Sequence, residues 1–234
     1  MGIEDLDTDR LNALKSEWDD RARRMGPTKR SVLFKRLPGF VNESIHRRHV
    51  GFILKNIPST AQTVLDVGCG YGRLSLEIKS AKPQISLYGV ELSSEFAKSY
   101  IQDIGPCFNG PVEEFQPEHH FDVVVLVTLL MYLTAEDQIK TISKIWSFLN
   151  PGGVVICIEP AVEIVRLWRR LTGKASANPT GGTVNTYTAD ELWNLFSSQD
   201  GATLAAQMSV NLIPGIGSTA LHHGLAVVKN RSNE

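Results

Sequence analysis

From Thr63 onward, short apolar segments alternate with segments of helical periodicity, and this alternation constrains the fold more than any other feature. Strands are predicted at 63–67, 85–91, 107–109, 123–127, 154–158, 204–212 and 225–229. Helices are predicted between them at 73–79, 94–101, 135–149 and 189–198. The segment 123–127 is apolar without a break, which is typical of a strand buried on both faces of a parallel sheet. The pattern therefore predicts an α/β protein with a doubly wound sheet.

A helical segment precedes this alternating core. Apolar residues from Leu11 to Met25 recur at steps of three and four, which predicts an amphipathic helix. A second helix is predicted to begin at Asn42, a good N-cap residue, and to end near residue 56. We therefore expect a helical N-terminal cap at 1–58 and the core at 59–234.

The charge of the chain is balanced overall but uneven along it. The formal net charge is −1 at pH 7, which argues against a nucleic-acid partner. Between Arg21 and Lys55, however, ten Lys and Arg residues stand against one acid, Glu43, a net charge of +9. This basic segment (21–55) is either an ordinary solvated face or a surface for an anionic partner.

The remaining composition is typical of a globular protein inside the cell. Hydrophobic residues make up 42% and charged residues 21% of the chain. The longest apolar run, 123–133, is too short to span a bilayer, and the acidic N-terminus is unlike a targeting peptide. Cys69, Cys107 and Cys157 lack the spacing of a metal site. We therefore expect a cytoplasmic protein with reduced cysteines, no membrane partner and no metal.

A glycine-rich turn follows the first predicted strand. Its sequence is Asp66-Val-Gly68-Cys-Gly70-Tyr-Gly72, which places three alternating glycines between a strand and a helix. Glycine permits the backbone angles and the close ligand approach that such a turn needs, and ligands bind where a doubly wound sheet first crosses over. A dinucleotide loop would have its third glycine one position later, at Arg73, so a pyrophosphate ligand is disfavoured.

A second acid stands at the end of the next predicted strand. Glu91 follows Asp66 by 25 residues. A carboxylate at this position can accept both hydroxyl groups of a ribose, as the corresponding acid does in dinucleotide folds. Taken alone, Glu91 is better explained as a helix-capping or surface acid, but its pairing with the glycine loop favours the ribose.

These features resemble the motif series of class I S-adenosylmethionine-dependent methyltransferases. The resemblance is carried by the loop 66–72, Glu91, the segment Phe121-Asp-Val-Val and the turn Asn150-Pro-Gly-Gly, and it covers about residues 60–160. It implies a Rossmann-like methyltransferase fold with a seven-stranded sheet whose last strand is antiparallel. It also implies an enzyme that transfers a methyl group from S-adenosylmethionine.

The resemblance also implies where the cofactor lies. Gly68, Cys69 and Gly70 would pack against its methionine part. Asp66 would support its amino end, and Glu91 would hold its ribose. Many relatives carry an acid before the residue that contacts adenine, but Pro111 stands there in this chain. The expected cofactor residues are Asp66, Gly68, Cys69, Gly70, Gly72, Glu91, Leu92, Val112, Glu113, Val127 and Thr128.

Candidates for the chemistry come from three places. Tyr132 follows the fourth predicted strand, where relatives often place a polar active-site residue, but it could instead pack at the start of a helix. His46 and His49 lie one helical turn apart in the N-terminal cap, and either is a candidate base or a packed histidine. His222 and His223 are interpreted as structural, while His119 and His120 fall at the edge of the sheet away from the ligand.

A long segment after the fifth predicted strand, 161–187, is expected to act as a lid. Arg166, Arg169 and Arg170 share one side of its helical first part, and arginine suits the capture of carboxylate or phosphate. Together with the methyl transfer that the resemblance implies, these residues predict O- or N-methylation of a small anionic or carrier-bound metabolite, as in secondary metabolism. Two alternatives remain: a peptide or RNA methyltransferase that uses the basic segment, and a non-catalytic module that only binds the cofactor.

Overall fold

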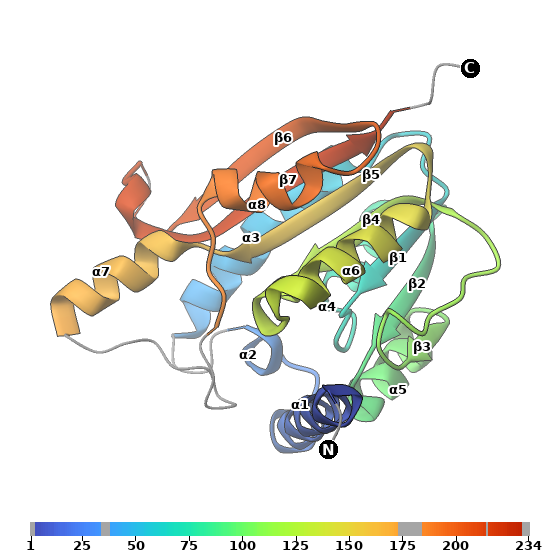
Figure 1. Ribbon diagram of the computed structural model, residues 1–234, viewed down its shortest axis with the longest axis horizontal. Coiled ribbons are helices and arrows are strands. Elements are labelled where there is room, and N and C mark those ends of the chain that lie inside the picture. Colours follow the sequence, from blue (N-terminus) through green and yellow to red (C-terminus); the bar gives the residue numbers. More distant parts are fainter. Residues whose placement is uncertain (1–2, 34–37, 173–183, 214, 231–234) are drawn as a thin grey trace.

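The computed structural model describes residues 3–33, 38–172, 184–213 and 215–230, and a seven-stranded sheet forms its centre (Figure 1). The strands are β1 (Thr63–Val67), β2 (Ser86–Glu91), β3 (Cys107–Asn109), β4 (Phe121–Val127), β5 (Leu149–Pro160), β6 (Ala202–Asn211) and β7 (Ala220–Lys229). Their order across the sheet is β3-β2-β1-β4-β5-β7-β6. Strand pairs from β3 to β5 are parallel, and β7 is antiparallel to both of its neighbours. The predicted doubly wound sheet with its antiparallel last strand is therefore confirmed.

Helices cover both faces of this sheet (Figure 1). They are α1 (Ile3–Met25), α2 (Lys29–Val32), α3 (Gly39–Asn56), α4 (Arg73–Ala81), α5 (Ser94–Asp103), α6 (Ala135–Ser147), α7 (Val162–Thr172) and α8 (Ala189–Ser197), with the short 3₁₀ helices η1 (Leu130–Tyr132) and η2 (Gly217–Thr219). Ile142 and Phe196 pack α6 and α8 against one face. Ile53 and Ile78 pack α3 and α4 against the other. Within the described residues, no helix combines the length and apolar character needed to cross a membrane.

Two threonines begin helices where the sequence predicts them. Thr188 accepts a hydrogen bond from the N–H of Glu191, whose carboxylate accepts one from the N–H of Thr188, so a full capping box starts α8. Thr134 accepts from the N–H of Asp137 at the start of α6. The Asp137 carboxylate instead accepts from the Thr134 hydroxyl and from Arg10 of α1. The start of α6 therefore contributes to a contact with α1.

Two local predictions are wrong. Asn42 is not an N-cap: α3 begins at Gly39 after Pro38, and Asn42 is buried inside the helix. Pro38 suits this position because its ring fixes φ, here −55°, and it has no N–H to leave unsatisfied. The periodicity of the helix predicted at 135–149 places Ile139, Ile142, Trp146 and Leu149 on one inner face. Ile139 is instead 62% exposed, because the stripe that packs on the sheet is centred on Ile142 and Ile145.

Strand β7 begins earlier than predicted, and this places two histidines inside the sheet. His222 pairs with Pro160 of β5, and His223 pairs with Glu159. Neighbouring residues of a strand point to opposite faces, so the two imidazoles lie on different sides of the sheet. His222 contacts His49 of α3, whereas His223 contacts α7.

The strand order reverses between β1 and β4, and this switch point organises the molecule. Loops that leave the carboxyl ends of β1 and β4 diverge to opposite faces of the sheet, which leaves a crevice between them. The glycine turn follows β1, and η1 follows β4. The residues predicted to bind a ligand are therefore brought to one edge of the sheet.

Candidate active site

The loop between β1 and α4 depends on glycines in the left-handed region of φ. Gly68, Gly70 and Gly72 have φ values of 71°, 56° and 88°. A side chain at Gly68 would place its Cβ 2.6 Å from Leu129, and one at Gly72 would collide with Ile104. The alternating glycines are therefore required both by backbone conformation and by the close approach of neighbouring side chains.

Glu91, at the end of β2, holds this loop in place. Its Oε2 accepts the N–H of Gly70 at 2.7 Å, and its Oε1 accepts the N–H of Ser93 at 2.8 Å. Burial raises the pKa of Glu91 to about 7, although the two N–H groups oppose this shift. Each carboxylate oxygen has a further lone pair, so Glu91 can also accept hydroxyl groups from a ligand.

Asp66, at the end of β1, lies at the end of a hydrogen-bond chain that starts on α5. The Tyr100 hydroxyl donates to the Ser75 hydroxyl at 3.1 Å, and Ser75 donates to Asp66 Oδ2 at 2.7 Å. Burial raises the pKa of Asp66 to about 6, whereas the Ser75 hydrogen bond and nearby Arg73 lower it. The chain fixes the direction of the carboxylate toward the cavity described next.

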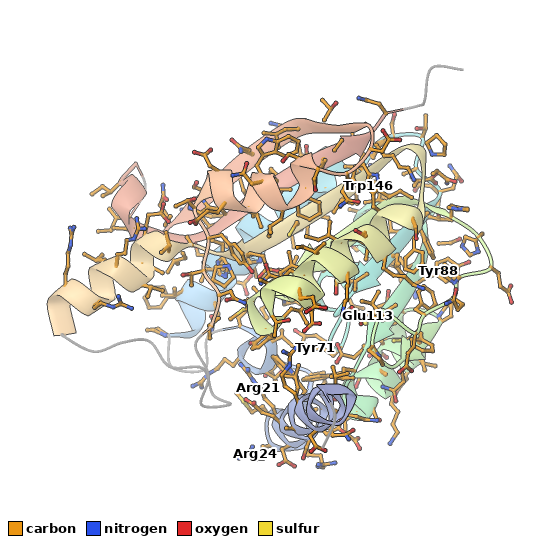
Figure 2. All side chains as sticks on the ribbon, viewed as in Figure 1. Arg21, Arg24, Tyr71, Tyr88, Glu113 and Trp146 are labelled. Atoms are coloured by element: carbon orange, nitrogen blue, oxygen red, sulfur yellow. The ribbon has the colours of Figure 1, made fainter. Side chains whose placement is uncertain are left out.

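A cavity that is partly open to solvent lies against these loops, and the space within it and its open mouth is about 1060 Å³. Every predicted cofactor residue except Gly72 lines it: Asp66, Gly68, Cys69, Gly70, Glu91, Leu92, Val112, Glu113, Val127 and Thr128. Gly72 instead faces Ile104 and Tyr100. Tyr132 also lines the cavity, as do Leu11, Leu14 and Trp18 of α1. In Figure 2, Tyr71 and Glu113 lie in the region between α1 and α6, whereas Trp146 lies toward the far end of α6.

The end of β4 has a strained conformation that the sequence did not predict. Thr128 has φ 57°, an uncommon angle for a β-branched residue. The buried carboxylate of Glu159, on β5, accepts the N–H groups of Leu129 at 2.9 Å and Leu130 at 2.8 Å, and it also lies 3.3 Å from the N–H of Met131. These contacts hold the turn, and burial raises the pKa of Glu159 to about 8. An acid at the end of a strand was the signal used for Asp66 and Glu91, and it could have identified Glu159.

Helix α1 is attached to the core at both sides of the cavity. Asp19 accepts hydrogen bonds from the Ser93 hydroxyl at 2.6 Å and from the N–H of Glu95 at 3.3 Å, at the start of α5. Arg10 forms an ion pair with Asp137 at 2.7 Å, at the start of α6. These two contacts position the apolar side of α1 as a wall of the cavity.

Tyr132 lies in an aromatic and cationic cluster beneath α1. Its ring meets that of Trp18 edge-on at 5.7 Å, and the guanidinium of Arg21 lies 4.8 Å from the centre of the Trp18 ring. Arg21 also donates to the carbonyl oxygen of Leu33 at 2.9 Å. Burial raises the pKa of Tyr132 to about 12, so its hydroxyl is a hydrogen-bond donor at neutral pH.

The two candidate histidines of α3 do not line the cavity. His46 Nδ1 lies 2.9 Å from Arg73 Nη1, and its Nε2 lies 3.0 Å from Glu77 Oε1. His49 is fully buried and meets the ring of His222 edge-on at 4.8 Å. Burial lowers the pKa of both candidate histidines and lowers that of His222 to about 3. All three imidazoles are therefore neutral in the folded protein near pH 7.

The remaining histidines lie elsewhere. His223 Nε2 is 2.9 Å from Glu163 of α7, and its Nδ1 is 2.9 Å from the Ser209 hydroxyl of β6. His119 packs on Tyr88 at the amino end of β4, on the far side of the sheet from the glycine loop. None of these imidazoles lines the cavity.

The three arginines of α7 are exposed and also lie outside the cavity lining. Arg166 is close enough to Glu191 of α8 to lower the pKa of that carboxyl, after the larger effect of the Thr188 hydrogen bonds. Residues 173–183 of the predicted lid lie outside the described residues. The structure thus places these arginines on a helix beyond β5 without a contact to the cavity.

Two cysteines that are far apart in the sequence meet beside the glycine loop. The sulfur atoms of Cys69 and Cys107 are 3.9 Å apart. A Cβ built on Gly89 of β2 would lie 2.8 Å from one sulfur and 3.1 Å from the other, so the missing side chain makes room for the pair. Burial raises the pKa of the Cys69 thiol well above its ordinary value. The third cysteine, Cys157, is buried within β5.

Comparison with known proteins identifies the family. Residues 14–204 match a family model described as a methyltransferase domain, which is more than half of the chain. The chain belongs to this methyltransferase family. The predicted methyltransferase family is thereby confirmed.

Curated relatives of this methyltransferase act on very different molecules. The tRNA N(3)-cytidine methyltransferase METTL2 of Danio rerio is 28% identical over 161 residues, which cover 60% of this chain and 45% of that protein. The ubiquinone biosynthesis O-methyltransferase of Nitrosospira multiformis is 25% identical over 163 residues, which cover 66% of this chain and 61% of that protein. The chain thus spans about half the length of the curated relatives it matches.

A solved structure supports the fold assignment. Magnesium protoporphyrin IX methyltransferase from Synechocystis PCC 6803, with bound SAH, superposes with a TM-score of 0.67 and 15% identity, over 94% of this chain and 100% of that one. The residues around the cavity fit such a cofactor chemically. Asp66 and Glu91 offer carboxylate acceptors for an ammonium group and for hydroxyl groups, and the glycine loop leaves the space that a Cβ would fill.

Proposed function

We propose that this methyltransferase transfers a methyl group from S-adenosylmethionine to an oxygen or nitrogen atom of a small, anionic metabolite. The observation that carries this proposal is the wall that α1 forms over the cavity. Leu11, Leu14 and Trp18 line the cavity together with the apolar side chains of Phe96, Leu129 and Leu133. The site is thus concave and largely apolar, as sites for small ligands and cofactors are, and this suits the cofactor together with a small acceptor.

The cavity residues have separate tasks in this proposal. When bound, S-adenosylmethionine supplies an electrophilic methyl group. Asp66 and Glu91 orient it through its ammonium and ribose hydroxyl groups, and Leu92, Val112 and Glu113 surround its adenine. The apolar side of α1 excludes water, so that reacting groups can be held in line in a dry site.

Two residues at the end of β4 face the acceptor in this proposal. Thr128 is held by its N–H bond of 2.8 Å to the carbonyl oxygen of Ile158 and by the Glu159-bound turn. The Tyr132 hydroxyl, with a pKa of about 12, donates a hydrogen bond that orients the acceptor. A carboxylate acceptor needs no general base because it is already deprotonated at neutral pH.

The anionic character of the acceptor is tested through α7. We propose that Arg166, Arg169 and Arg170 attract the acceptor, because their exposed guanidinium groups follow directly after β5. Replacing all three by Met should raise KM for the acceptor about tenfold or more while leaving the affinity for S-adenosylhomocysteine unchanged. An acceptor KM that does not change in the triple variant would contradict this role.

An RNA acceptor is the second candidate, because one relative is named as a tRNA methyltransferase and the segment 21–55 is basic. Several of these basic groups already have partners. Arg23 pairs with Asp20 and Lys29 with Glu43, and Arg21 is buried. Fewer charges are therefore free to contact phosphates.

One assay separates the two acceptor classes. S-adenosylhomocysteine release is measured with a panel of carboxylates, phenols and amines, and in parallel with total tRNA. We expect turnover with a small anion and little effect of salt between 50 and 200 mM. Turnover with tRNA that falls steeply over this salt range would instead establish the RNA acceptor.

A further inference from the structure

Arg73 is a buried cation in the wall of the cofactor cavity. It is the first residue of α4, its side chain is 6% exposed, and it lines the cavity. Burial lowers the pKa of its guanidinium to about 10, so it stays protonated at neutral pH. Buried charges are almost always paired with an opposite charge, because desolvation of an unpaired ion is very unfavourable.

No carboxylate among the described side chains forms an ion pair with Arg73. The two nearest acids are engaged elsewhere: Asp66 accepts from Ser75, and Glu77 contacts His46. A guanidinium has five N–H donors in a planar fork, and the contact with His46 uses one of them. The fork thus retains donors for an anion, and the cavity is the space it borders.

His46 fixes the position of this guanidinium. Arg73 can only donate, so His46 Nδ1 must be the acceptor in their 2.9 Å contact. The imidazole proton is then on Nε2, where it is donated to Glu77 at 3.0 Å. Glu77, His46 and Arg73 therefore form a directed chain across α3 and α4 that ends at the cavity.

We propose that Arg73, held in place by His46 and Glu77, forms a carboxylate-binding subsite of the cavity. Two carboxylates can reach a site beside the glycine loop: that of the methionine part of the cofactor, and that of an acceptor bound next to it. Both present the planar pair of oxygens that a guanidinium binds through two parallel hydrogen bonds. In this assignment His46 is a positioning residue and not the general base.

The first experiment compares two ligands that differ in one carboxylate. S-adenosylmethionine and decarboxylated S-adenosylmethionine are titrated calorimetrically into the wild-type protein, Arg73→Met and Arg73→Lys. We expect Arg73→Met to weaken S-adenosylmethionine binding at least tenfold. Its affinity for the decarboxylated ligand should stay within threefold of the wild-type value. Arg73→Lys keeps the positive charge but lacks the planar guanidinium, so its affinity for S-adenosylmethionine should lie between those of the wild type and Arg73→Met. It also keeps the test informative if Arg73→Met does not fold. Arg47→Met, an exposed arginine on α3, is the matched control and should change neither affinity.

The second experiment asks whether the carboxylate belongs to the acceptor. The protein is saturated with S-adenosylhomocysteine and then titrated with malonate as a simple dicarboxylate. Malonate binding that disappears in Arg73→Met assigns the subsite to the acceptor. The proposal is overturned if Arg73→Met weakens both cofactor forms equally, or if it changes neither of them and malonate binding does not depend on Arg73.

The third experiment tests the positioning role of His46. His46→Leu removes the acceptor for Arg73, whereas His46→Gln retains an acceptor oxygen. We expect the Leu variant to lose most of the preference for S-adenosylmethionine over its decarboxylated form and the Gln variant to keep it. If the wild type and both variants prefer S-adenosylmethionine over its decarboxylated form to the same extent, His46 does not position Arg73. Wild-type binding of S-adenosylmethionine is measured in the same series. Because these titrations contain no acceptor, a result that overturns the subsite leaves the proposed acceptor class untouched.

Discussion

The carboxyl group of Glu159 combines two properties that a substitution can separate. It accepts the N–H groups of Leu129 and Leu130, and burial raises its pKa to about 8. Glu159→Gln keeps one acceptor oxygen for these two donors and should cost less than about 1 kcal/mol of unfolding free energy at pH 6. Glu159→Ala leaves both donors buried without an acceptor and should cost about 2–3 kcal/mol. Urea denaturation measures both values.

Comparing the wild type with Glu159→Gln also tests how the stability depends on pH. An unfolded glutamate titrates near pH ~4.3, so a folded pKa of about 8 means that the folded state takes up a proton between these values. The stabilising effect of protonated Glu159 is complete below pH ~4.3 and is lost as pH rises through 8. Wild type should therefore lose stability relative to Glu159→Gln between pH 5 and 8. Parallel stability curves for the two proteins would show that Glu159 is ionised throughout.

The acids at strand ends were predictable, and the arginine and histidines near the cavity were not. Asp66 and Glu91 each end a strand, so their place in the sequence is enough to bring them to the carboxyl edge of the sheet. Arg73 and His46 are 27 residues apart on two helices, and their contact depends on how α3 and α4 pack. Sequence periodicity predicts the buried side of each helix, but it does not predict which neighbouring side chain it meets.

Helix α1 is joined to the rest of the chain through few polar contacts, and one of them can be removed cleanly. Asp19→Ala removes the acceptor for Ser93 and Glu95 at the start of α5. Loss of these charge-assisted bonds should loosen the α1 wall and speed S-adenosylhomocysteine dissociation about five- to tenfold. Stopped-flow displacement measures this rate.

The neighbouring residue supplies the control for α1. Asp20 is exposed and pairs with Arg23 on the same helix, so Asp20→Ala removes the same charge and leaves both hydrogen bonds of Asp19 to α5 in place. We expect its dissociation rate to equal that of the wild type. If both variants release the ligand at the same rate, the contact between α1 and α5 does not restrain the cavity wall.

Element boundaries were predicted where local chemistry decides them. Thr188 and Glu191 define the start of α8 through a capping box that involves no other element. Strand β7 was predicted too short because its first half contains His222 and His223, which do not look like strand-core residues. Their burial depends on partners from α3, α7 and β6, and these contacts form only in the folded sheet. The short helices α2, η1 and η2 lack a periodic signal altogether.

The face of the sheet covered by α3 gathers three neutral histidines, and this makes the whole fold sensitive to acid. Burial lowers the pKa of His46, His49 and His222, with Arg73 adding to the effect on each, and the pKa of His222 falls to about 3. Unfolded histidine titrates near pH ~6.5. The stability that these groups support is therefore present above pH ~6.5 and is lost as pH falls below it.

A single substitution should make the fold less sensitive to acid. With a folded pKa of about 3, His222 alone accounts for about 2 kcal/mol of lost unfolding free energy between pH 7 and 5. Between pH 7 and 5, His222→Phe should therefore lose about 2 kcal/mol less unfolding free energy than the wild type does. Denaturation at each pH measures this difference. His120→Phe, on an exposed histidine, is the matched control and should keep the slope of the wild type. If the slope of His222→Phe equals that of the control, His222 does not contribute to acid unfolding.

The general architecture was the most predictable property of the molecule. The chain combines an unbroken apolar strand, a glycine turn and alternating helices. Few arrangements bury all the apolar faces of these elements, and the doubly wound sheet is one that does. The acceptor is not predictable in this way. Its contacts come from loops and helices at the rim of the cavity, whose sequences do not affect how the sheet folds.

The cysteine pair beside Gly89 has a practical consequence for labelling this protein. Cys107 is half-buried and adjoins Cys69, which lines the cavity. A thiol reagent that reaches Cys107 therefore arrives next to the glycine loop, where the two sulfur atoms already fill the space beside Gly89. Alkylation should proceed readily with small reagents and slowly with bulky ones. A fluorophore attached at this position would report directly on whether the cofactor cavity is filled.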